Sequence, residues 1–355
     1  MGLGVALRSI RYSTRPLGPQ LKDLFMPIDL KTARILVAGG GGFIGGALVK
    51  RLSTLGANDI QVADIKPLQD WYHVDPNLKN QVLDLGDKKS AFEATAGRTV
   101  VFNLAADMGG MGFIETHKAE CMLTVLINTH LLMGAKEAGV ERFFYSSSAC
   151  VYNADKQVDA NVQALKEADA YPAMPEDGYG WEKLFSERMC RHFTEDYGLA
   201  TRVARYHNVY GPDGTFEGGR EKAPAALCRK IAEAKLSGKH EIEIWGDGEQ
   251  TRSFMYIDDC LDGTLRLTLS DITEPLNIGS SELVSINQMA SIIEKIAGIS
   301  VKRVYDLDAP KGVRGRNSDN TLIQEKMGWQ PSIRLADGLE RTYAWIYDQI
   351  APRFK

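Results

Sequence analysis

The chain has 355 residues, of which 44% are hydrophobic and 25% are charged, and its formal net charge is −4. These values are typical of a globular protein and exclude a disordered or fibrous chain. The lack of a basic surplus argues against nucleic acid as the principal ligand. Because no apolar run approaches the roughly 18 residues that cross a bilayer, we expect no membrane partner either.

The N-terminal residues differ in composition from the rest, and we predict that residues 1–30 form an extension. Residues 1–22 contain arginines and serines but no acidic residue. Mitochondrial transit peptides have this composition, and so do uncleaved, loosely ordered extensions. The five cysteines are scattered without CxxC spacing, which indicates free thiols in a reducing compartment. The cytoplasm is therefore the expected location, with organellar import as the alternative.

From residue 33 onward, strand-like and helix-like segments alternate. A helical period over residues 43–52 follows the first strand-like run. Apolar, β-rich runs predict strands at residues 34–38, 59–64, 99–104, 141–147 and 201–206. This βαβα order predicts an α/β fold built on a Rossmann-type, doubly wound parallel sheet.

The segment GGGGFIG joins the first predicted strand to the first helix and has the spacing G-x-x-G-x-x-G. Glycine gives this turn its backbone freedom and lets a pyrophosphate approach the helix N-terminus. An aspartate at the end of the next strand can accept the ribose hydroxyls of NAD and would repel the extra phosphate of NADP. The motif predicts an NAD site made of Gly39, Gly42, Phe43, Ile44, Gly45, Asp64 and Asp84. For Asp84, a simple turn or cap role is the alternative.

After residue 206 the alternation gives way to loops, glycines and shorter elements, as is typical of a smaller substrate-binding domain. We therefore predict an NAD-binding Rossmann domain over residues 31–206. A mainly substrate-binding domain is predicted over residues 207–355. A short apolar run near residues 274–280 is expected to return to the sheet as a late strand.

Tyr179 and Lys183 form the pattern Tyr-x-x-x-Lys, which places both side chains on one face of a helix. The lysine ammonium can lower the pKa of the phenol, which then removes a proton from a sugar hydroxyl as hydride leaves for NAD. Ser148 ends a run of three serines at the end of a predicted strand, where its hydroxyl can share the same substrate oxygen. Together the three residues predict oxidation of an alcohol.

Several segments occur in the order typical of one enzyme family: the glycine motif, NLAAD (103–107), SSSACVY (146–152), YGWEK (179–183) and RYHNVYGP (205–212). The chain thus resembles the extended short-chain dehydrogenase/reductases, which include sugar epimerases and dehydratases. This resemblance implies Tyr179 as the base, Lys183 as its partner and cofactor clamp, and Ser148 as the hydroxyl partner. It also places His207 near the nicotinamide.

Within this family, further segments are similar to those of the GDP-mannose 3,5-epimerases: DMGGMGFI (107–114), GGREKAPAA (218–226), GDGEQTRSF (246–254) and GVRGRNSDN (312–320). The similarity implies a nucleotide-sugar substrate, a homodimer, and Cys150 and Lys222 as acid/base groups. It also implies a substrate site made of Gly109, Ser148, Cys150, Asn208, Glu221, Lys222, Ala223, Lys230, Gln250, Arg252 and Arg314.

Two acid/base groups suit this reaction, because oxidation at C4 of the sugar acidifies the hydrogens on C3 and C5. Cys150 follows the strand that delivers Ser148, so we expect its thiol beside the substrate. Pro224 suits the first turn of a helix. The positive end of that helix is expected to lower the pKa of Lys222.

Two other functions stay open at this point. One is a different NAD-dependent nucleotide-sugar epimerase or dehydratase, although a dehydratase usually has Asp-Glu in place of Ala149-Cys150. The other is a non-catalytic NAD-binding protein, against which the complete set of Ser148, Tyr179 and Lys183 argues. No group of His, Cys and carboxylate residues has metal-ligand spacing, so we expect no metal.

Overall fold

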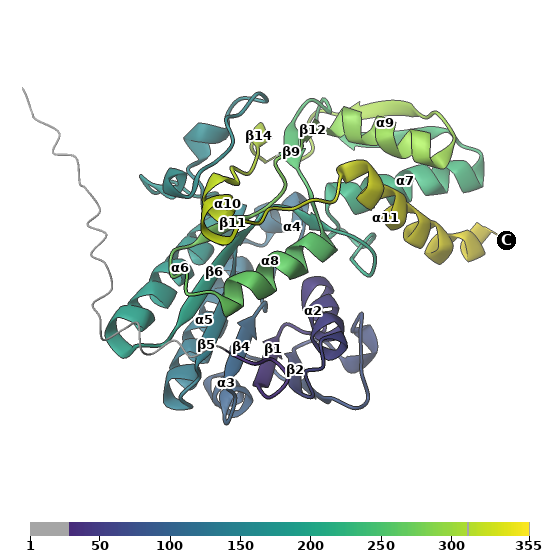
Figure 1. Ribbon diagram of the computed structural model, residues 1–355. Coiled ribbons are helices and arrows are strands. Elements are labelled where there is room, and N and C mark those ends of the chain that lie inside the picture. The colour runs from purple at the N-terminus through teal and green to yellow at the C-terminus, as the bar shows by residue number, and fades with distance from the viewer. Residues whose placement is uncertain (1–27, 311, 355) are drawn as a thin grey trace, which may run out of the picture.

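The structure, a computed structural model, describes residues 28–310 and 312–354. The predictions for residues 1–22 therefore fall outside the described residues. A seven-stranded sheet lies at the centre of the molecule, with strand order β11-β6-β5-β4-β1-β2-β3 (Figure 1). Every pair of neighbouring strands in it is parallel. The predicted α/β class and doubly wound parallel sheet are confirmed.

The strands of this sheet follow the apolar runs of the sequence closely. The five strands predicted from those runs are β1 (Arg34–Ala38), β2 (Asp59–Asp64), β4 (Val100–Asn103), β5 (Arg142–Ser148) and β6 (Thr201–Tyr206). An edge strand, β3 (Lys79–Val82), was not predicted, because its sequence KNQV is largely polar. The late strand expected near residues 274–280 is β11 (Leu276–Ile278), which pairs with β6.

Helices cover both faces of the sheet, which explains why its strands are almost continuously apolar. One face carries α2 (Phe43–Thr54) and α8 (Ile257–Leu269), and the other carries α3 (Lys88–Thr95), α5 (Lys118–Glu137) and α6 (Asp177–Tyr197). Alternate residues of β1 serve the two faces: Ile35 and Val37 pack into one core, and Leu36 and Ala38 into the other. All four side chains are fully buried.

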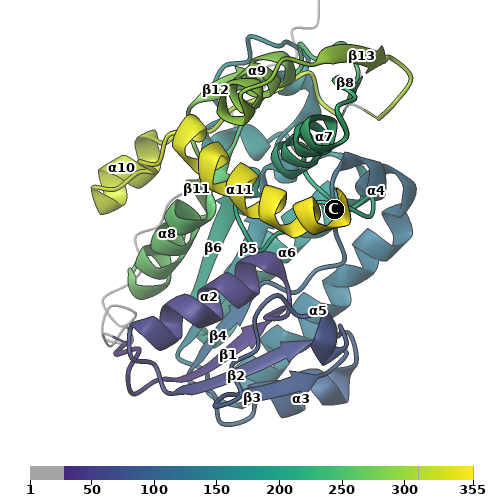
Figure 2. The ribbon, with the colours of Figure 1, turned by 90° about the vertical axis from the view of Figure 1, so that its right-hand side faces the viewer.

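A second group of elements lies at one end of the sheet (Figure 2). Three helices pack on one another there: α7 (Ala223–Ser237), α9 (Ile286–Ala297) and α11 (Leu335–Ile350). Three small sheets accompany them: β8 (Glu241–Trp245) with β13 (Lys302–Asp306), β7 (Val209–Tyr210) with β10 (Met255–Tyr256), and β9 (Thr251–Ser253) between β12 (Leu283–Ser285) and β14 (Gly315–Arg316). Two short helices complete the chain, α4 (Met111–Thr116) and α10 (Thr321–Met327).

The hydrophobic core continues from the sheet into this second group. One cluster of buried side chains runs from Val37 in β1 through Tyr210 in β7 to Ile231 in α7 and Leu339 in α11. The two groups of elements therefore share one core.

The order of the strands also indicates where a ligand binds. β1 and β4 are neighbours, and the chain leaves them toward opposite faces of the sheet, which opens a crevice at their carboxyl ends. Gly39, just after β1, approaches the segment after β4 so closely that an added Cβ would lie 2.7 Å from the nitrogen of Ala105.

Candidate active site

The glycine loop between β1 and α2 has the conformation that a dinucleotide-binding turn requires. Gly39 has φ of +81°, a left-handed conformation that side chains disfavour. An added Cβ at Gly45 would lie 2.1 Å from the carbonyl oxygen of Gly39, so a side chain there would push the helix away from the turn. The N-terminus of α2 thus stays open to an anionic group.

A cavity of about 270 Å³ extends from this loop along the ends of the strands. The predicted cofactor residues that line it are Gly39, Gly42, Phe43, Ile44, Gly45, Tyr179 and Lys183. The Nζ of Lys183 is buried and has no hydrogen-bond partner among the described residues. An ammonium in that state calls for oxygen acceptors, as the ribose hydroxyls of NAD would supply. The glycine cradle and this lysine fit NAD.

Three predicted cofactor residues do not line the cavity. Asp64 accepts hydrogen bonds from the backbone N–H groups of Gly41 and Lys66, each at 3.0 Å, so its carboxylate holds the glycine loop in this structure. Asp84 accepts from the N–H of Gly86 at 2.8 Å and closes a turn, which was the alternative given for it. His207 is fully buried, and burial lowers its pKa to about 3, so the ring is neutral.

A larger cavity of about 440 Å³ adjoins the first, and both are lined by Ser148, Tyr179 and Lys222. Its wall contains ten of the predicted substrate residues: Gly109, Ser148, Cys150, Asn208, Glu221, Lys222, Ala223, Lys230, Gln250 and Arg252. The structure therefore brings together residues from segments that are more than a hundred positions apart in the sequence.

Tyr179 lies where the two cavities meet, and its side chain is hydrogen-bonded to that of Ser148. We expected Lys183 to lower the pKa of this phenol. Instead, burial raises the pKa well above its ordinary value, and the negative charges of the Cys150 and Glu182 sites add to the rise. The Lys183 Nζ lies 5.6 Å from the centre of the phenol ring, too far to outweigh the burial.

Cys150 lies in a short helical turn directly after β5, with its thiol in the larger cavity. Burial raises its pKa to about 11, and the carboxylate of Glu176 contributes to the rise. Arg316 opposes the effect, since its Nη1 lies 3.6 Å from Sγ. Arg316 stands in the same GVRGRNSDN segment as Arg314.

Lys222 directly precedes α7, whose first turn contains Pro224, as predicted. Its pKa is lowered, in the direction that we expected. The largest cause is burial, to which the positive charge of Arg316 adds, so enclosure by the cavity does more than the helix end. A larger share of this lysine is therefore a neutral amine, the form that accepts a proton.

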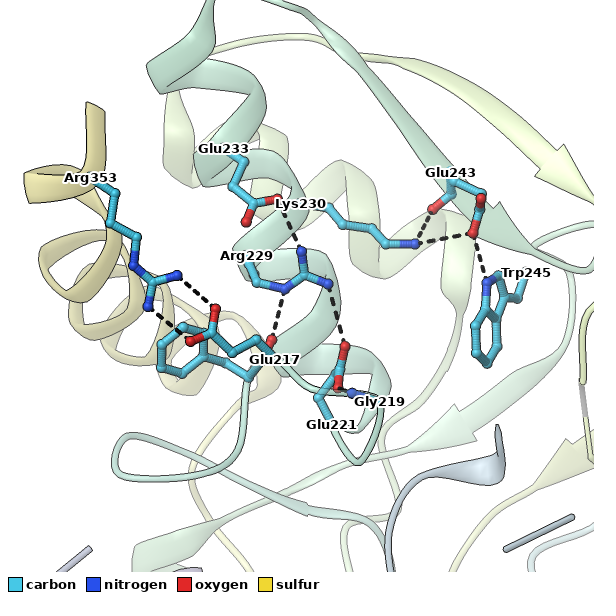
Figure 3. A network of polar contacts seen from close by, with 10 residues as sticks. Glu217, Gly219, Glu221, Arg229, Lys230, Glu233, Glu243, Trp245 and Arg353 are labelled. Atoms are coloured by element: carbon cyan, nitrogen blue, oxygen red, sulfur yellow. Dashed lines mark hydrogen bonds and ion pairs between the residues drawn. The ribbon is translucent and has the colours of Figure 1, made fainter. Parts of the chain in front are cut away.

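The far end of the larger cavity lies between α7 and β8 (Figure 3). Lys230 donates a hydrogen bond of 2.8 Å from Nζ to the carbonyl oxygen of Glu243. The indole of Trp245 donates to the Glu243 carboxylate at 2.7 Å. Glu221, another predicted residue, is held by Arg229 at 3.3 Å. Glu243 and Trp245 line the cavity, but no motif singled them out in the sequence.

Arg314 was predicted to contact the substrate, but its guanidinium is not part of the cavity wall. It forms an ion pair of 2.8 Å with Asp247, and both side chains are partly exposed. The reason is local: Arg314 lies just before strand β14, whereas Arg316, in the strand, is buried beside Cys150. Among residues 28–310 and 312–354, no group of three or more His, Cys, Asp or Glu side chains could hold a metal ion.

A family model described as "NAD dependent epimerase/dehydratase family" matches residues 35–279, which include the glycine loop, Ser148, Tyr179 and Lys183. The chain belongs to this family. NAD is accordingly the cofactor of this epimerase/dehydratase, in agreement with the glycine cradle and with Lys183, whose Nζ lies 3.7 Å from the Glu182 carboxylate and has no hydrogen-bond partner among the described residues.

The curated relatives of this epimerase/dehydratase include plant enzymes. GDP-mannose 3,5-epimerase 1 of Oryza sativa subsp. japonica is 49% identical over 89% of this chain and 82% of its own length. GDP-mannose 3,5-epimerase of Arabidopsis thaliana is 45% identical over 89% of this chain and 83% of its own length.

Among solved structures, the fold is similar to that of UDP-glucose 4-epimerase from Thermotoga maritima, determined with UDP-glucose. The TM-score is 0.79 at 27% identity, and the match covers 89% of this chain and 99% of that chain. The similarity thus extends over both groups of elements, including those that build the larger cavity.

Proposed function

We propose that the protein is a GDP-mannose 3,5-epimerase, which converts GDP-D-mannose to GDP-L-galactose. The observation that carries the proposal is that Cys150 and Lys222 line the same cavity as Ser148 and Tyr179. A simple 4-epimerase needs only the oxidation and reduction that the last two support, whereas inversion beside a ketone needs two further acid/base groups. Relatives at 45% and 49% identity with this activity support the assignment.

Tyr179 is the group that moves the proton of the sugar hydroxyl at C4. Its hydrogen bond with Ser148 orients the phenol, and the serine hydroxyl can bind the same substrate oxygen. The Nζ of Lys183 lies 5.6 Å from the centre of the phenol ring and has no hydrogen-bond partner among the described residues, so its N–H groups can donate to the ribose hydroxyls of NAD beside Tyr179. Bound NAD supplies the acceptor and later the donor of the C4 hydride.

Cys150 and Lys222 then act on the carbons beside the C4 ketone. They come from different elements, one after β5 and the other before α7, and each interacts electrostatically with the other in the shared cavity. One group removes a proton from carbon and the other returns a proton to the opposite face, which inverts the centre. Cys150 is buried and Lys222 is half-buried, so the cavity limits the access of bulk water to their proton transfers.

The GDP moiety occupies the rest of the cavity in this proposal. Arg252 and Lys230 lie on its wall and supply positive charge for the diphosphate. Burial lowers the pKa of Arg252 to about 10, so it stays a cation at neutral pH. An anion that pairs with this guanidinium would compensate the cost of burying it.

Incubation with GDP-mannose in D₂O tests the proposal. We expect GDP-L-galactose that carries deuterium at the inverted carbons and none at C4, since the C4 hydrogen never exchanges with water. Cys150→Ala is expected to stop inversion at C5 but to leave C4 oxidation, visible as the absorbance of reduced NAD in a single turnover. A panel of GDP- and UDP-hexoses serves as the control, and preferred turnover of a UDP-hexose without deuterium uptake would contradict the proposal.

The two alternative functions considered from the sequence agree less well with the structure. Ala149 and Cys150 occupy the turn after β5, so the Asp-Glu pair typical of dehydratases is absent from it. A non-catalytic NAD-binding protein would have no need for Ser148, Tyr179 and Lys222 around the junction of two cavities.

We also propose that two copies of the chain associate through α5 and α6. These neighbouring helices expose large apolar side chains, namely Met122, Leu123, Leu126, Trp181 and Phe185, which are between 41% and 61% exposed. Such a concentration on two packed helices is typical of a buried helix–helix interface.

The mass of the native protein in solution, from light scattering, tests this association. We expect the mass of two chains, and the mass of one chain for Leu123→Glu. Leu307→Glu changes an equally exposed leucine elsewhere and serves as the matched control. A native protein with the mass of one chain would contradict the proposal.

In the described part of the chain, no helix has the length and apolarity that a membrane crossing requires. All five cysteines are free thiols. On the strength of these thiols we propose the cytoplasm as the compartment. Imaging of a fluorescent fusion to the full chain tests this location, and mitochondrial fluorescence would favour the transit-peptide alternative instead.

A further inference from the structure

The mechanism above does not use Glu176, a buried carboxylate next to Cys150. Its side chain is only 12% exposed, and its residue immediately precedes α6, the helix that carries Tyr179 and Lys183. The backbone N–H of Glu176 donates to the carbonyl oxygen of Cys150 at 3.0 Å. This bond fixes the start of the helix against the cysteine, so the two side chains stay together.

Arg316 connects the two residues. Its Nη2 donates to Oε1 of Glu176 at 2.5 Å, its Nη1 lies 3.6 Å from Sγ of Cys150, and its Nε donates to Gln157 at 2.7 Å. The second carboxylate oxygen, Oε2, is buried with no hydrogen-bond partner among the described residues. The Cys150 thiol itself is hydrogen-bonded to the Glu176 carboxylate, so the two side chains interact directly.

The charge of this carboxylate acts on the thiol. Burial by itself would raise the pKa of Glu176, but Arg316 and the Cys150 thiol outweigh burial and the pKa lies below its ordinary value. Glu176 is therefore an anion at neutral pH. An anion beside a thiol disfavours the thiolate, and its interaction with Cys150 has this sign.

We propose that Glu176 is a positioning residue whose carboxylate keeps Cys150 in the thiol form, so that Cys150 enters the reaction as a proton donor. The inference rests on the proposed function and assigns the direction of proton transfer within it. Lys222, whose enclosure favours the neutral amine, is then the group that removes the proton from carbon.

Other charged and titratable groups also face Cys150. Two guanidinium groups supply positive charge, Arg316 in β14 and Arg252 in β9. The amine of Lys222, before α7, and the hydroxyl of Tyr179, in α6, also interact with the thiol. Glu176 is the carboxylate among these neighbours within the described residues. Burial is the largest cause of the raised pKa of Cys150, and the Glu176 carboxylate is the next; without this carboxylate, the neighbouring positive charge of Arg316 would lower that pKa.

Inversion in this proposal transfers one proton from carbon to Lys222 and one from Cys150 to carbon. Lys222 takes a proton from the carbon beside the ketone, and the electron pair of the broken C–H bond delocalises into the carbonyl. The S–H bond of Cys150 then breaks as a new C–H bond forms on the opposite face, and the thiolate is left beside Arg316. Exchange with solvent returns the ammonium to an amine and the thiolate to a thiol, which is also how deuterium enters the product.

The pH dependence of Cys150 alkylation by iodoacetamide, without substrate, tests the inference. Mass spectrometry of the peptide that contains Cys150 reports the rate, and Cys150→Ala identifies the signal. In Glu176→Gln we expect the midpoint to fall by about one pH unit, which makes alkylation near neutral pH about tenfold faster than in the native protein. Glu176→Asp keeps the charge and is expected to stay closer to the native midpoint.

Arg316→Gln is the matched control, for which we expect a shift in the opposite direction. Loss of this positive charge should raise the pH midpoint of Cys150 alkylation above the native value. If iodoacetamide reaches the buried thiol too slowly, the ultraviolet absorbance of the thiolate reports the ionisation of Cys150 instead. It is measured at each pH as the difference between the protein and its Cys150→Ala variant. An unchanged midpoint in a folded Glu176→Gln protein would overturn the inference. Since no substrate is present, this result is independent of whether the protein epimerises GDP-mannose.

Discussion

The cofactor side and the substrate side of this active site are assembled in different ways. The cofactor cavity is lined mostly by residues at the ends of successive parallel strands, and its glycine loop is a single turn between β1 and α2. The substrate cavity combines Cys150 after β5 with Lys222 before α7 and Arg316 in β14. The contact between Arg316 and Cys150 joins residues that are 166 positions apart.

This difference has a consequence for the chemistry. Residues at the junction, such as Tyr179, serve both cavities, so their loss should stop every step. Cys150 lines only the substrate cavity, and Lys222 lines both cavities but acts on carbon, so their loss should affect inversion more than oxidation. Residues outside the wall, such as Arg314, should matter little.

Tyr179→Phe is expected to have the largest effect. It removes the phenolic oxygen that takes the proton of the C4 hydroxyl and keeps the ring that fills the buried site. Turnover should fall by a factor on the order of 10²–10⁴, the usual contribution of a positioned acid or base. Both C4 oxidation and deuterium uptake should disappear together. Deuterium uptake at C5 that survived in this variant would show that the two cavities act independently.

Lys222→Met should separate the two sides. The replacement keeps most of the stem volume and removes the amine, so binding of GDP-mannose should weaken by no more than about 1–2 kcal/mol. Turnover should fall by about 10² or more because proton removal from carbon fails. Single-turnover absorbance should still show C4 oxidation. Near-native deuterium at C3 and C5 would mean that this lysine only positions the substrate.

The pH profile of kcat/KM should have two limbs set by the substrate side. Lys222 acts as the neutral amine, and burial lowers its pKa below the ordinary lysine value, so the rate should rise as pH passes this lowered pKa. Cys150 acts as the thiol, so the rate should fall as pH passes its pKa of about 11. Rates measured across this range in a stable buffer series check the signs. A profile that fell with pH where Lys222 deprotonates would reverse the assigned roles.

The smallest effect is expected at Arg314, with Arg252 as its matched comparison. Arg252→Ala removes a cation from the cavity wall and should raise KM by about tenfold or more. Arg314→Ala breaks only a partly exposed ion pair with Asp247, so KM should change by less than about fivefold. Steady-state kinetics with GDP-mannose measure both. Equal effects would mean that Arg314 turns into the cavity when substrate binds.

Much of the cofactor side could be predicted from local sequence. The run Arg34–Ala38 is apolar at every position after the first, so it must be a strand buried on both faces, and the glycines that follow need a turn free of side chains. Prediction was weaker for β3, because an edge strand pairs through its backbone and tolerates polar side chains such as those of KNQV. Asp64 was recognised by its place at the end of β2, but its hydrogen bond to the glycine loop was not predicted.

On the substrate side, motifs identified Cys150 and Lys222 but not the charges around them. Glu176 precedes a helix in the segment PED, where an acidic residue is common for local reasons and indicates nothing about a cysteine. Arg316 and Arg314 have the same chemistry two positions apart, and only the packing of β14 distinguishes the buried guanidinium from the exposed one. The rise of the Tyr179 pKa likewise follows from burial, which no spacing of residues reveals.

The sequence by itself thus determined the α/β class and the glycine cradle, because backbone freedom and apolar periodicity are properties of short segments. It predicted the proton-carrying groups through motifs similar to those of a known family. Only the tertiary structure decided how those groups are protonated. A pKa depends on the solvent and the charges within a few ångströms. The groups that surround Cys150 belong to α6, β9, β14 and the start of α7. These segments meet only because the second group of elements shares the core of the sheet.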